Sequence, residues 1–197
     1  VSTPHTELYA QGGNTTERFI RYHVEKAKGG IGLTMAGASS VSLDSPQLWG
    51  PSVDVTSDEI IPHFQNLAKA VHLHGSAIMI QLTHLGRRSR WDRNYWPHLV
   101  SPSGVREPLT RGTAKVIELE DIKRIQLNFA QAARRVKEGG LDGAEISAAH
   151  QHLIDQFWSP RTNKRCDAYG RSLEKRMRFG IEVLESIREE VGEEFCI

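Results

Sequence analysis

Four stretches of the chain carry apolar residues at intervals of three and four positions, the spacing that gathers them on one face of an α-helix. The first begins at Asn14, with Glu17 as its capping partner, and the others begin after Thr56, near Asp121 and after Ser172. Each stretch ends at glycine, the usual residue after the last helical turn. The sequence therefore predicts four amphipathic helices, which end at Gly29, Gly75, Gly139 and Gly192.

A short apolar run follows each of these glycines. Short runs that do not alternate with polar residues are typical of strands buried on both faces. The predicted strands cover residues 31–35, 77–81, 144–146 and 195–197, and residues 1–3 have the pattern of the end of a further strand. Helices and strands therefore alternate, which predicts an α/β fold with a parallel sheet and right-handed crossovers.

The connections between these elements differ in length on the two sides of the predicted sheet. Helix-to-strand links are short, whereas strand-to-helix links cover residues 36–57, 82–119 and 147–172. In a (β/α)8 TIM barrel the functional loops follow the strands, so this asymmetry favours a barrel. A doubly wound sheet shares part of the asymmetry and stays an alternative at this point. The absence of a GxGxxG or GxxxxGK[ST] phosphate loop argues against Rossmann and P-loop domains.

The length of the chain sets how much of a barrel it can form. A complete TIM barrel takes roughly 250 residues, so we expect residues 1–197 to form one partial barrel domain with about five of the eight strands. The chain opens at Val1 and closes on the apolar run 195–197, in the middle of a predicted strand. We therefore expect the sequence to be part of a longer protein.

Composition narrows the classes of partner. The 25 Lys and Arg residues balance 24 Asp and Glu residues, so we expect neither nucleic acid nor a membrane surface as a partner. Apolar runs fall far short of the roughly 20 residues of a membrane span. The two cysteines, Cys166 and Cys196, are predicted to be reduced thiols, which indicates a cytoplasmic location.

Side chains that could bind a ligand or take part in catalysis gather in the long connections. These connections also contain Trp49, Trp91, Trp96 and Trp158. Ser147, His150 and His152 follow the strand at 144–146, where a histidine can donate to a carbonyl or anion, move a proton, or merely brace the loop. The His150-x-His152 pair could also form half of a metal site, although no partner with recognisable ligand spacing accompanies it.

A second group follows the strand at 77–81. Gln81 is predicted to point into the barrel mouth, where its amide can read the polar edge of a planar ring. His84, Gly86 and a cluster of three arginines come next, and the arginines are Arg87, Arg88 and Arg90. A buried amide and a solvated basic turn are the alternative interpretation of these residues.

Three motifs together resemble the Old Yellow Enzyme family of FMN-dependent NADH:flavin oxidoreductases. They are QLTHLGR at 81–87, SPS at 101–103 and DQFWSPRTNKRCDAYGRSLE at 155–174. Within that family, HQHLIDQFWSP at 150–160 and SPSGVREP at 101–108 are most similar to the branch of dimethylglycine and N-methylproline demethylases and trimethylamine dehydrogenase. The resemblance implies a TIM barrel that carries FMN across its strand ends.

The resemblance also implies roles for individual positions. The residues expected to contact FMN are Ser2, Thr3 and Pro4 through their backbone, Ala36 or Gly37 near the ring, and Gln81 at the pyrimidine edge. Those expected to bind substrate are His84, Arg87, Arg88 and Trp158, with the two arginines suited to a carboxylate. Those expected to be catalytic are Ser147, His150 and His152.

Four departures from the family pattern shape the expected activity. Ser147 replaces the first member of the substrate-gripping pair of the ene-reductases, and His152 replaces their proton-donating tyrosine. Thr6 stands where trimethylamine dehydrogenase has its flavin-linking cysteine, and Ala38 replaces an aromatic cage residue. The resemblance therefore implies non-covalent FMN and a substrate other than a caged small cation.

The expected activity is oxidative N-demethylation of an N-methylated amino acid or amine by hydride transfer to FMN. The alternatives are an NAD(P)H-dependent ene- or 2,4-dienoyl reductase and a metal-dependent barrel hydrolase that uses His150 and His152. For the part of the protein outside this chain, the resemblance implies a 4Fe–4S cluster and a portion that binds FAD or NAD(P). A small-molecule substrate, a homo-oligomer and an electron-transfer partner complete the expectation.

Overall fold

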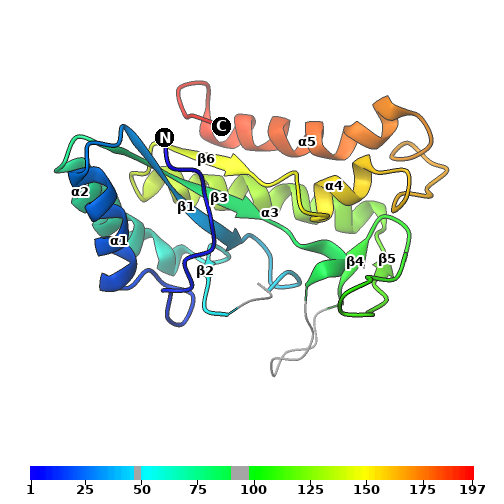
Figure 1. Cartoon of the computed structure of the whole chain (residues 1–197). Coiled ribbons are helices and arrows are strands. Elements are labelled where there is room, and N and C mark those ends of the chain that lie inside the picture. Colours follow the sequence, from blue (N-terminus) through cyan, green and yellow to red (C-terminus); the bar gives the residue numbers. More distant parts are fainter. Residues whose placement is uncertain (47–49, 90–97) are drawn as a thin grey trace.

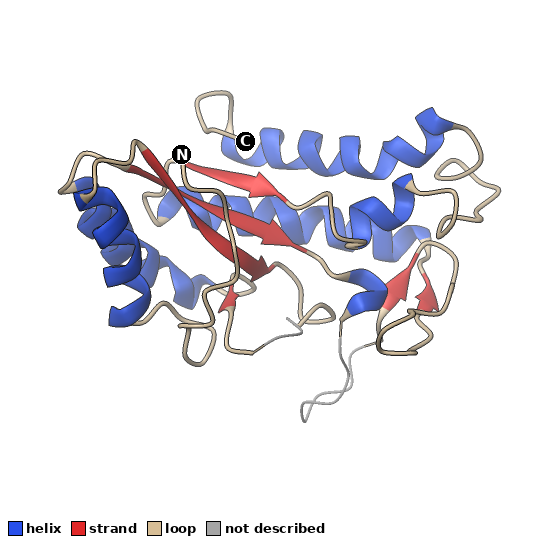
Figure 2. Ribbon diagram, viewed as in Figure 1, coloured by secondary structure: helices blue, strands red, loops and turns tan. Residues whose placement is uncertain are grey.

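The computed structural model describes residues 1–46, 50–89 and 98–197. A twisted parallel sheet forms one layer of the molecule, and helices pack behind it as a second layer (Figures 1 and 2). Residues 47–49 and 90–97 lie outside the described residues, and they include four residues named in the sequence analysis: Trp49, Arg90, Trp91 and Trp96.

Six strands form two sheets within the described ranges. The main sheet is parallel, has the order β2-β1-β3-β6, and consists of β1 (Leu33–Ser40), β2 (Val53–Asp54), β3 (Ala77–Thr83) and β6 (Gly143–Ile146). The small sheet pairs β4 (Val100–Ser101) with β5 (Lys115–Val116). The predicted strands at 31–35, 77–81 and 144–146 are thus confirmed, although β1 begins at Leu33 and runs on to Ser40.

The order of neighbouring strands separates the two alternatives for the fold. Ser2 forms a parallel bridge with Thr34 of β1, β1 pairs with β3, β3 pairs with β6, and Gly143 of β6 forms a parallel bridge with Cys196. Each of these segments therefore lies beside the next one along the chain, without the reversal of order that defines a doubly wound sheet. This is the progression of a TIM barrel, of which the chain forms part. The predicted strand ends at 1–3 and 195–197 take part as single bridges.

The described residues contain five α-helices. They are α1 (Glu17–Lys28), α2 (Ile61–His72), α3 (Leu119–Glu138), α4 (Leu153–Trp158) and α5 (Leu173–Val191), with 3-10 turns at Asp58–Ile60 and Gly86–Arg88. Four of the helices pack around the sheet, while α4 follows the loop at the end of β6. None of the helices in the described ranges has the length and apolar character that a membrane crossing requires. Figure 1 shows α3 and α5 side by side behind the strands.

The helix caps show where local signals succeeded. The Ser172 side chain accepts a hydrogen bond from the backbone N–H of Lys175, as expected for the cap of α5. The first helix was predicted to begin at Asn14, and this is wrong: Thr16 is the cap and accepts from the N–H of Phe19 at 3.2 Å. Asn14 instead exchanges backbone hydrogen bonds with Gln11 in a tight turn.

The two faces of β3 have different environments, and this places the functional groups. Ile78, Ile80 and Leu82 are fully buried in the hydrophobic core. Because side chains alternate along a strand, Gln81 and Thr83 project from the opposite face. That face belongs to the barrel interior, so the polar residues of β3 lie where a barrel holds its ligands.

Candidate active site

The carboxyl ends of the parallel strands meet at one edge of the sheet, and the loops that leave them are joined there. The N–H of Ser147, just after β6, donates to the carbonyl of Leu82 in β3 at 3.0 Å. The N–H of Leu153 donates to the carbonyl of His84 at 2.8 Å. The β3 and β6 loops therefore form one connected surface at the strand ends.

A polar pair lies inside this edge. Gln81 and Glu145 are partners in the β3–β6 register, and Nε2 of Gln81 donates to Oε1 of Glu145 at 2.8 Å. The hydroxyl of Thr83 is buried and has no hydrogen-bond partner among the described residues. Neither Glu145 nor Thr83 was a predicted site residue. Thr83 could have been predicted, because residues two positions apart in a strand project from the same face and Gln81 was already a candidate. The contact between Gln81 and Glu145 depends on the pairing of β3 with β6, which the sequence does not reveal.

Ser147 and His152 form a hydrogen-bonded pair at the mouth of β6. The Ser147 hydroxyl lies 3.0 Å from Nδ1 of His152, so Nε2 is the ring nitrogen left for a ligand. Burial lowers the pKa of His152 to about 4, and the nearby positive groups of His150, Arg88 and His84 add to this. The His152 imidazole is therefore neutral near pH 7, and it can offer or accept a hydrogen bond without carrying charge.

His150 lies beside this pair on an unusual turn. Its ring centroid is 5.9 Å from that of His152, and the residue is exposed. Both His150 and Gln151 have a φ of 57°, a left-handed conformation that non-glycine residues rarely adopt. The turn is held because NH1 of Arg88 donates to the His150 carbonyl at 2.6 Å, and Asp155 accepts from the N–H of Gln151 at 2.8 Å.

The two arginines of the β3 loop have different environments. Arg87 is buried, and its guanidinium donates to the carbonyls of Val105 and Arg106 and to Oε1 of Gln151. Arg88 is half-buried, with its Nε 3.6 Å from Oε1 of the buried Glu107. Arg88 is also the arginine that lowers the pKa of His152, so it lies on the side of the histidines.

Two predicted substrate residues, His84 and Trp158, have side chains that are engaged within the fold. The His84 ring is buried, its Nε2 lies 3.0 Å from Oδ1 of Asp44, and its Nδ1 accepts from the N–H of Gly86. Trp158 packs against α5, where a Cβ built on Gly180 would lie 3.1 Å from the indole nitrogen. Both side chains are therefore engaged within the fold, although His84 lies near enough to His152 to contribute to the lowering of its pKa.

The N-terminal segment crosses the strand ends at β1. Ser2 is fastened to β1 by two backbone hydrogen bonds, and the carbonyl of His5 lies so close to Gly37 that an added Cβ would meet it at 1.7 Å. The N–H of Gly37 donates to both carboxylate oxygens of Glu7 at 3.1 Å. Ala36 belongs to the hydrophobic core, so Gly37 is the member of the predicted pair that contacts the N-terminal segment, at His5 and Glu7.

The strand-end residues fit the polar edge of a planar ring. Oε1 of Gln81 accepts no hydrogen bond within the described ranges, while its Nε2 is engaged by Glu145. The unpartnered hydroxyl of Thr83 lies two residues further along the same strand face. These groups supply both a donor and an acceptor at the barrel interior, as recognition of the flavin pyrimidine edge requires.

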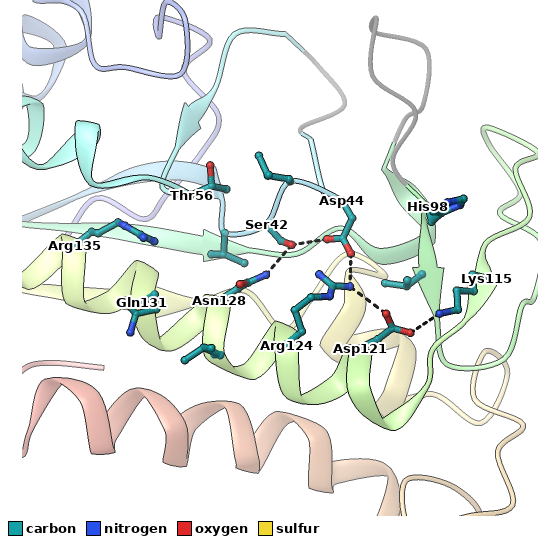
Figure 3. Close-up of a pocket in the computed structure, with 14 residues that line it drawn as sticks. Ser42, Asp44, Thr56, His98, Lys115, Asp121, Arg124, Asn128, Gln131 and Arg135 are labelled. Atoms are coloured by element: carbon teal, nitrogen blue, oxygen red, sulfur yellow. Dashed lines mark hydrogen bonds and ion pairs between the residues drawn. The ribbon is translucent and has the colours of Figure 1, made fainter.

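A cavity of about 570 Å³ lies outside this edge, between the loop after β1 and helix α3 (Figure 3). Its charged groups neutralise one another, since Arg124 bonds both Asp44 and Asp121, and Asp121 bonds Lys115. Burial alone would raise the pKa of Asp44, but hydrogen bonds from His84, Ser42 and Arg124 hold it well below its usual range. The cavity thus presents a closed ion-pair network, and the strand ends are the better candidate site.

No group of three or more His, Cys, Asp or Glu side chains in the described ranges comes together to hold a metal ion. The structure therefore brings no further ligand to the His150-x-His152 pair.

Comparisons with known proteins show the family of the chain. The NADH:flavin oxidoreductase / NADH oxidase family matches residues 1–197. The chain is 64% identical to N,N-dimethylglycine/sarcosine dehydrogenase of Chromohalobacter salexigens and 48% identical to a probable N-methylproline demethylase of Rhizobium meliloti. In both cases the match covers 100% of this chain and 29% of the relative, so the chain spans less than a third of these relatives.

Solved structures give the same result. A 2-naphthoyl-CoA reductase complex superposes with a TM-score of 0.92 at 28% identity, covering 100% of this chain and 32% of that one. Old Yellow Enzyme from Pichia sp. AKU4542 superposes with a TM-score of 0.90 at 25% identity, covering 99% and 53%. These matches place the chain among the flavin-dependent oxidoreductases. The chain belongs to the NADH:flavin oxidoreductase / NADH oxidase family.

Proposed function

We propose that the protein oxidatively demethylates an N-methylated amino acid. One observation carries the proposal: a cationic guanidinium, an exposed imidazole and a neutral imidazole meet at the strand ends, in Arg88, His150 and His152. An N-methyl amino acid offers a carboxylate to the first and an amine to the others. The relatives named as dimethylglycine/sarcosine dehydrogenase and N-methylproline demethylase support this substrate class.

FMN would be held by the backbone of Ser2, Thr3 and Pro4, by Gly37 and by the amide of Gln81. When bound, FMN supplies the hydride acceptor for oxidation of the N-methyl carbon. Loss of the hydride leaves a substrate iminium, and water then splits it into formaldehyde, the demethylated amine and a proton. The protein's part is to bind the substrate, to free the nitrogen lone pair and to tolerate the positive charge that develops.

Arg88 binds the substrate carboxylate, because its charge faces the histidines and an arginine pairs with a carboxylate through two parallel hydrogen bonds. His150 accepts the proton of the substrate ammonium, since its ring is exposed at the strand ends and an imidazole nitrogen can serve as a general base. His152 remains uncharged beside the reacting nitrogen. A neutral ring, fixed by Ser147, does not repel the cation that forms as hydride leaves.

Ene reduction is the second candidate, and one comparison favours it. The chain is 44% identical to a protein from Caballeronia cordobensis named multifunctional alkene reductase/demethylase OYE. In that reaction His150 and His152 would donate hydrogen bonds to the carbonyl of an unsaturated substrate. The serine at position 147 reduces this grip, because a hydroxyl does not reach as far as an imidazole.

The remaining length of the relatives leaves room for the other expected parts. We propose that the full-length protein carries a 4Fe–4S cluster and a portion that binds FAD or NAD(P), acts in the cytoplasm as a homo-oligomer, and passes its electrons to a partner. These proposals concern residues beyond this chain.

The experiment is anaerobic mixing of the full-length protein with dimethylglycine, N-methylproline or a 2-enoate, followed in the visible range. Bleaching of the flavin band by an N-methyl amino acid, with release of formaldehyde, is the expected result. A flavin that amines leave oxidised, but that NAD(P)H reduces and the enoate reoxidises, would establish the reductase instead.

A further inference from the structure

One buried side chain joins the two loops that carry the proposed substrate residues. Gln156 lies in α4 and is almost completely buried. Its Nε2 donates to the carbonyl of Leu85 at 2.9 Å and to the carbonyl of Gln151 at 2.6 Å. Its Oε1 accepts from the N–H of Arg87 at 3.3 Å. The amide therefore bonds the β3 loop on one side and the β6 loop on the other.

The approach of this amide depends on a glycine. Gly86 has a φ of 58°, and a Cβ built on it would lie 2.6 Å from Oε1 and 2.8 Å from Nε2 of Gln156. Any other residue at this position would displace the amide. The absence of a side chain at Gly86 thus leaves the space that the Gln156 amide fills, and the amide in turn bonds the backbone of the β3 loop.

The loop on the other side cannot hold its shape alone. His150 and Gln151 are both left-handed, a conformation that costs free energy in non-glycine residues and persists only where the surroundings enforce it. Arg88 holds the His150 carbonyl, and Gln156 holds the Gln151 carbonyl. Arg88 belongs to the β3 loop, and Gln156 is bonded to that loop, so both hydrogen bonds connect the left-handed turn to the β3 loop.

We infer that Gln156 is a positioning residue, which sets the placement of the Arg88 guanidinium relative to the His150 imidazole. Its role in turnover rests on the proposed function, because it acts through two residues assigned to the substrate. Gln156 itself touches neither substrate nor flavin: it is buried beneath the two loops and all its bonds go to their backbone.

The first test measures the loops themselves in the flavin-loaded full-length protein. Gln156→Met keeps the side-chain length and removes the amide, and Gln156→Glu replaces the donating nitrogen with a carboxyl oxygen that faces the carbonyls of Leu85 and Gln151. Hydrogen–deuterium exchange should rise in residues 84–88 and 147–153 for both variants. The matched control is Gln126→Met, which breaks a side-chain hydrogen bond to Glu182 between α3 and α5 and should leave these loops unchanged. Unchanged exchange in the loops of either Gln156 variant that folds would overturn the inference.

The second test separates positioning from a general loss of structure. Gln156→Met should raise the KM for the N-methyl amino acid about tenfold while the flavin absorbance spectrum stays the same. In a His150→Ala background the same substitution should add less than twofold, because its target is already absent. If Gln156→Met raised the KM by the same factor with and without His150→Ala, a role through His150 would be contradicted.

The two tests also distinguish this inference from the proposed function. If exchange rises in the two loops but no N-methyl amino acid reduces the wild-type flavin, the proposed function fails and the positioning role stands. If the substrate reduces the flavin but the loops of the Gln156 variants exchange as in the wild type, the inference fails and the proposed function stands.

Discussion

The hydroxyl of Ser147 lies 3.0 Å from Nδ1 of His152, across the left-handed turn formed by His150 and Gln151. The turn folds the chain back so that the residue just after β6 meets the residue just before α4. The hydrogen bond fixes the orientation of the His152 ring and directs its Nε2 away from Ser147. A serine at this position therefore acts as the support of a second residue, rather than as a direct grip on the substrate.

The pH dependence of stability should reflect His152. Its pKa is about 4 in the folded protein and about 6.5 when unfolded, so the unfolded state binds the extra proton between these values. Stability should be constant above pH 6.5 and fall by about 2 kcal/mol between pH 6.5 and pH 5. Urea unfolding of the wild type and of His152→Gln at pH 6.5 and pH 5 measures this change in the free energy of unfolding. A loss of equal size in His152→Gln would assign the effect to another group.

Arg88→Gln should weaken binding of the substrate carboxylate. A hydrogen bond to a charged group contributes about 1.5–3 kcal/mol, so the KM for an N-methyl amino acid should rise about 10- to 100-fold. For an N-methylated amine without a carboxylate, the KM should rise much less. Arg21→Gln is the control, because this arginine forms an exposed pair with Glu17 on α1, outside the loops that carry the proposed substrate residues. Equal losses for both substrates would argue against the carboxylate contact.

Gly37→Ala should displace the N-terminal segment from β1. The added methyl would meet the carbonyl of His5, so the segment expected to contact FMN has to move. We expect FMN binding to weaken tenfold or more, on the order of 1–3 kcal/mol. Gly32→Ala is the matched control, because its Cβ would meet nothing within 4 Å. Flavin fluorescence gives both dissociation constants, and the same value for the two variants would show that the segment does not hold FMN.

Phe179→Ala should destabilise the packing of α5 on the site-bearing helix α4. The rings of Phe157 and Phe179 are stacked with centroids 4.4 Å apart, and both are fully buried. Removing one ring should cost about 3–5 kcal/mol of unfolding free energy. Leu184→Ala on the exposed side of the same helix should change it by less than about 0.5 kcal/mol. Chemical denaturation measures both, and a small loss for Phe179→Ala would place the stabilising contacts elsewhere.

Elements with strong local signals could be predicted, and those defined by contact could not. The Ser172 cap and the glycines after α1, α3 and α5 locate those helix ends, because capping involves residues only a few positions apart. The second helix was predicted to end at Gly75, but α2 ends at His72 with Leu73 as its cap. Helix α4 has six residues, too few for a recognisable period, and it was missed. Strands β4 and β5 have two residues each and are defined only by their pairing with each other. Thr16 replaced Asn14 as a cap because Asn14 is taken by a turn with Gln11.

The candidate site divides in the same way. Motif and strand-end position led to the prediction of Gln81, Ser147, His150 and His152, and the structure places them at one edge of the sheet, as expected of residues at the ends of parallel strands. Whether an arginine or histidine there faces a ligand depends on partners that lie far along the chain. Asp44 turns His84 inward, and the carbonyls of the 105–106 segment bind Arg87. Sequence spacing contains no information about these contacts.

By itself the sequence determined the alternation of helix and strand, the long loops after the strands and the family, because periodicity, glycine stops and long motifs are local properties. Only the tertiary structure decided that the strands follow one another in barrel order, that Arg88 rather than Arg87 lies on the side of the histidines, and that Gln156 joins the two loops. Burial and hydrogen bonding between residues more than sixty positions apart decide these points, and both arise only when the chain is folded.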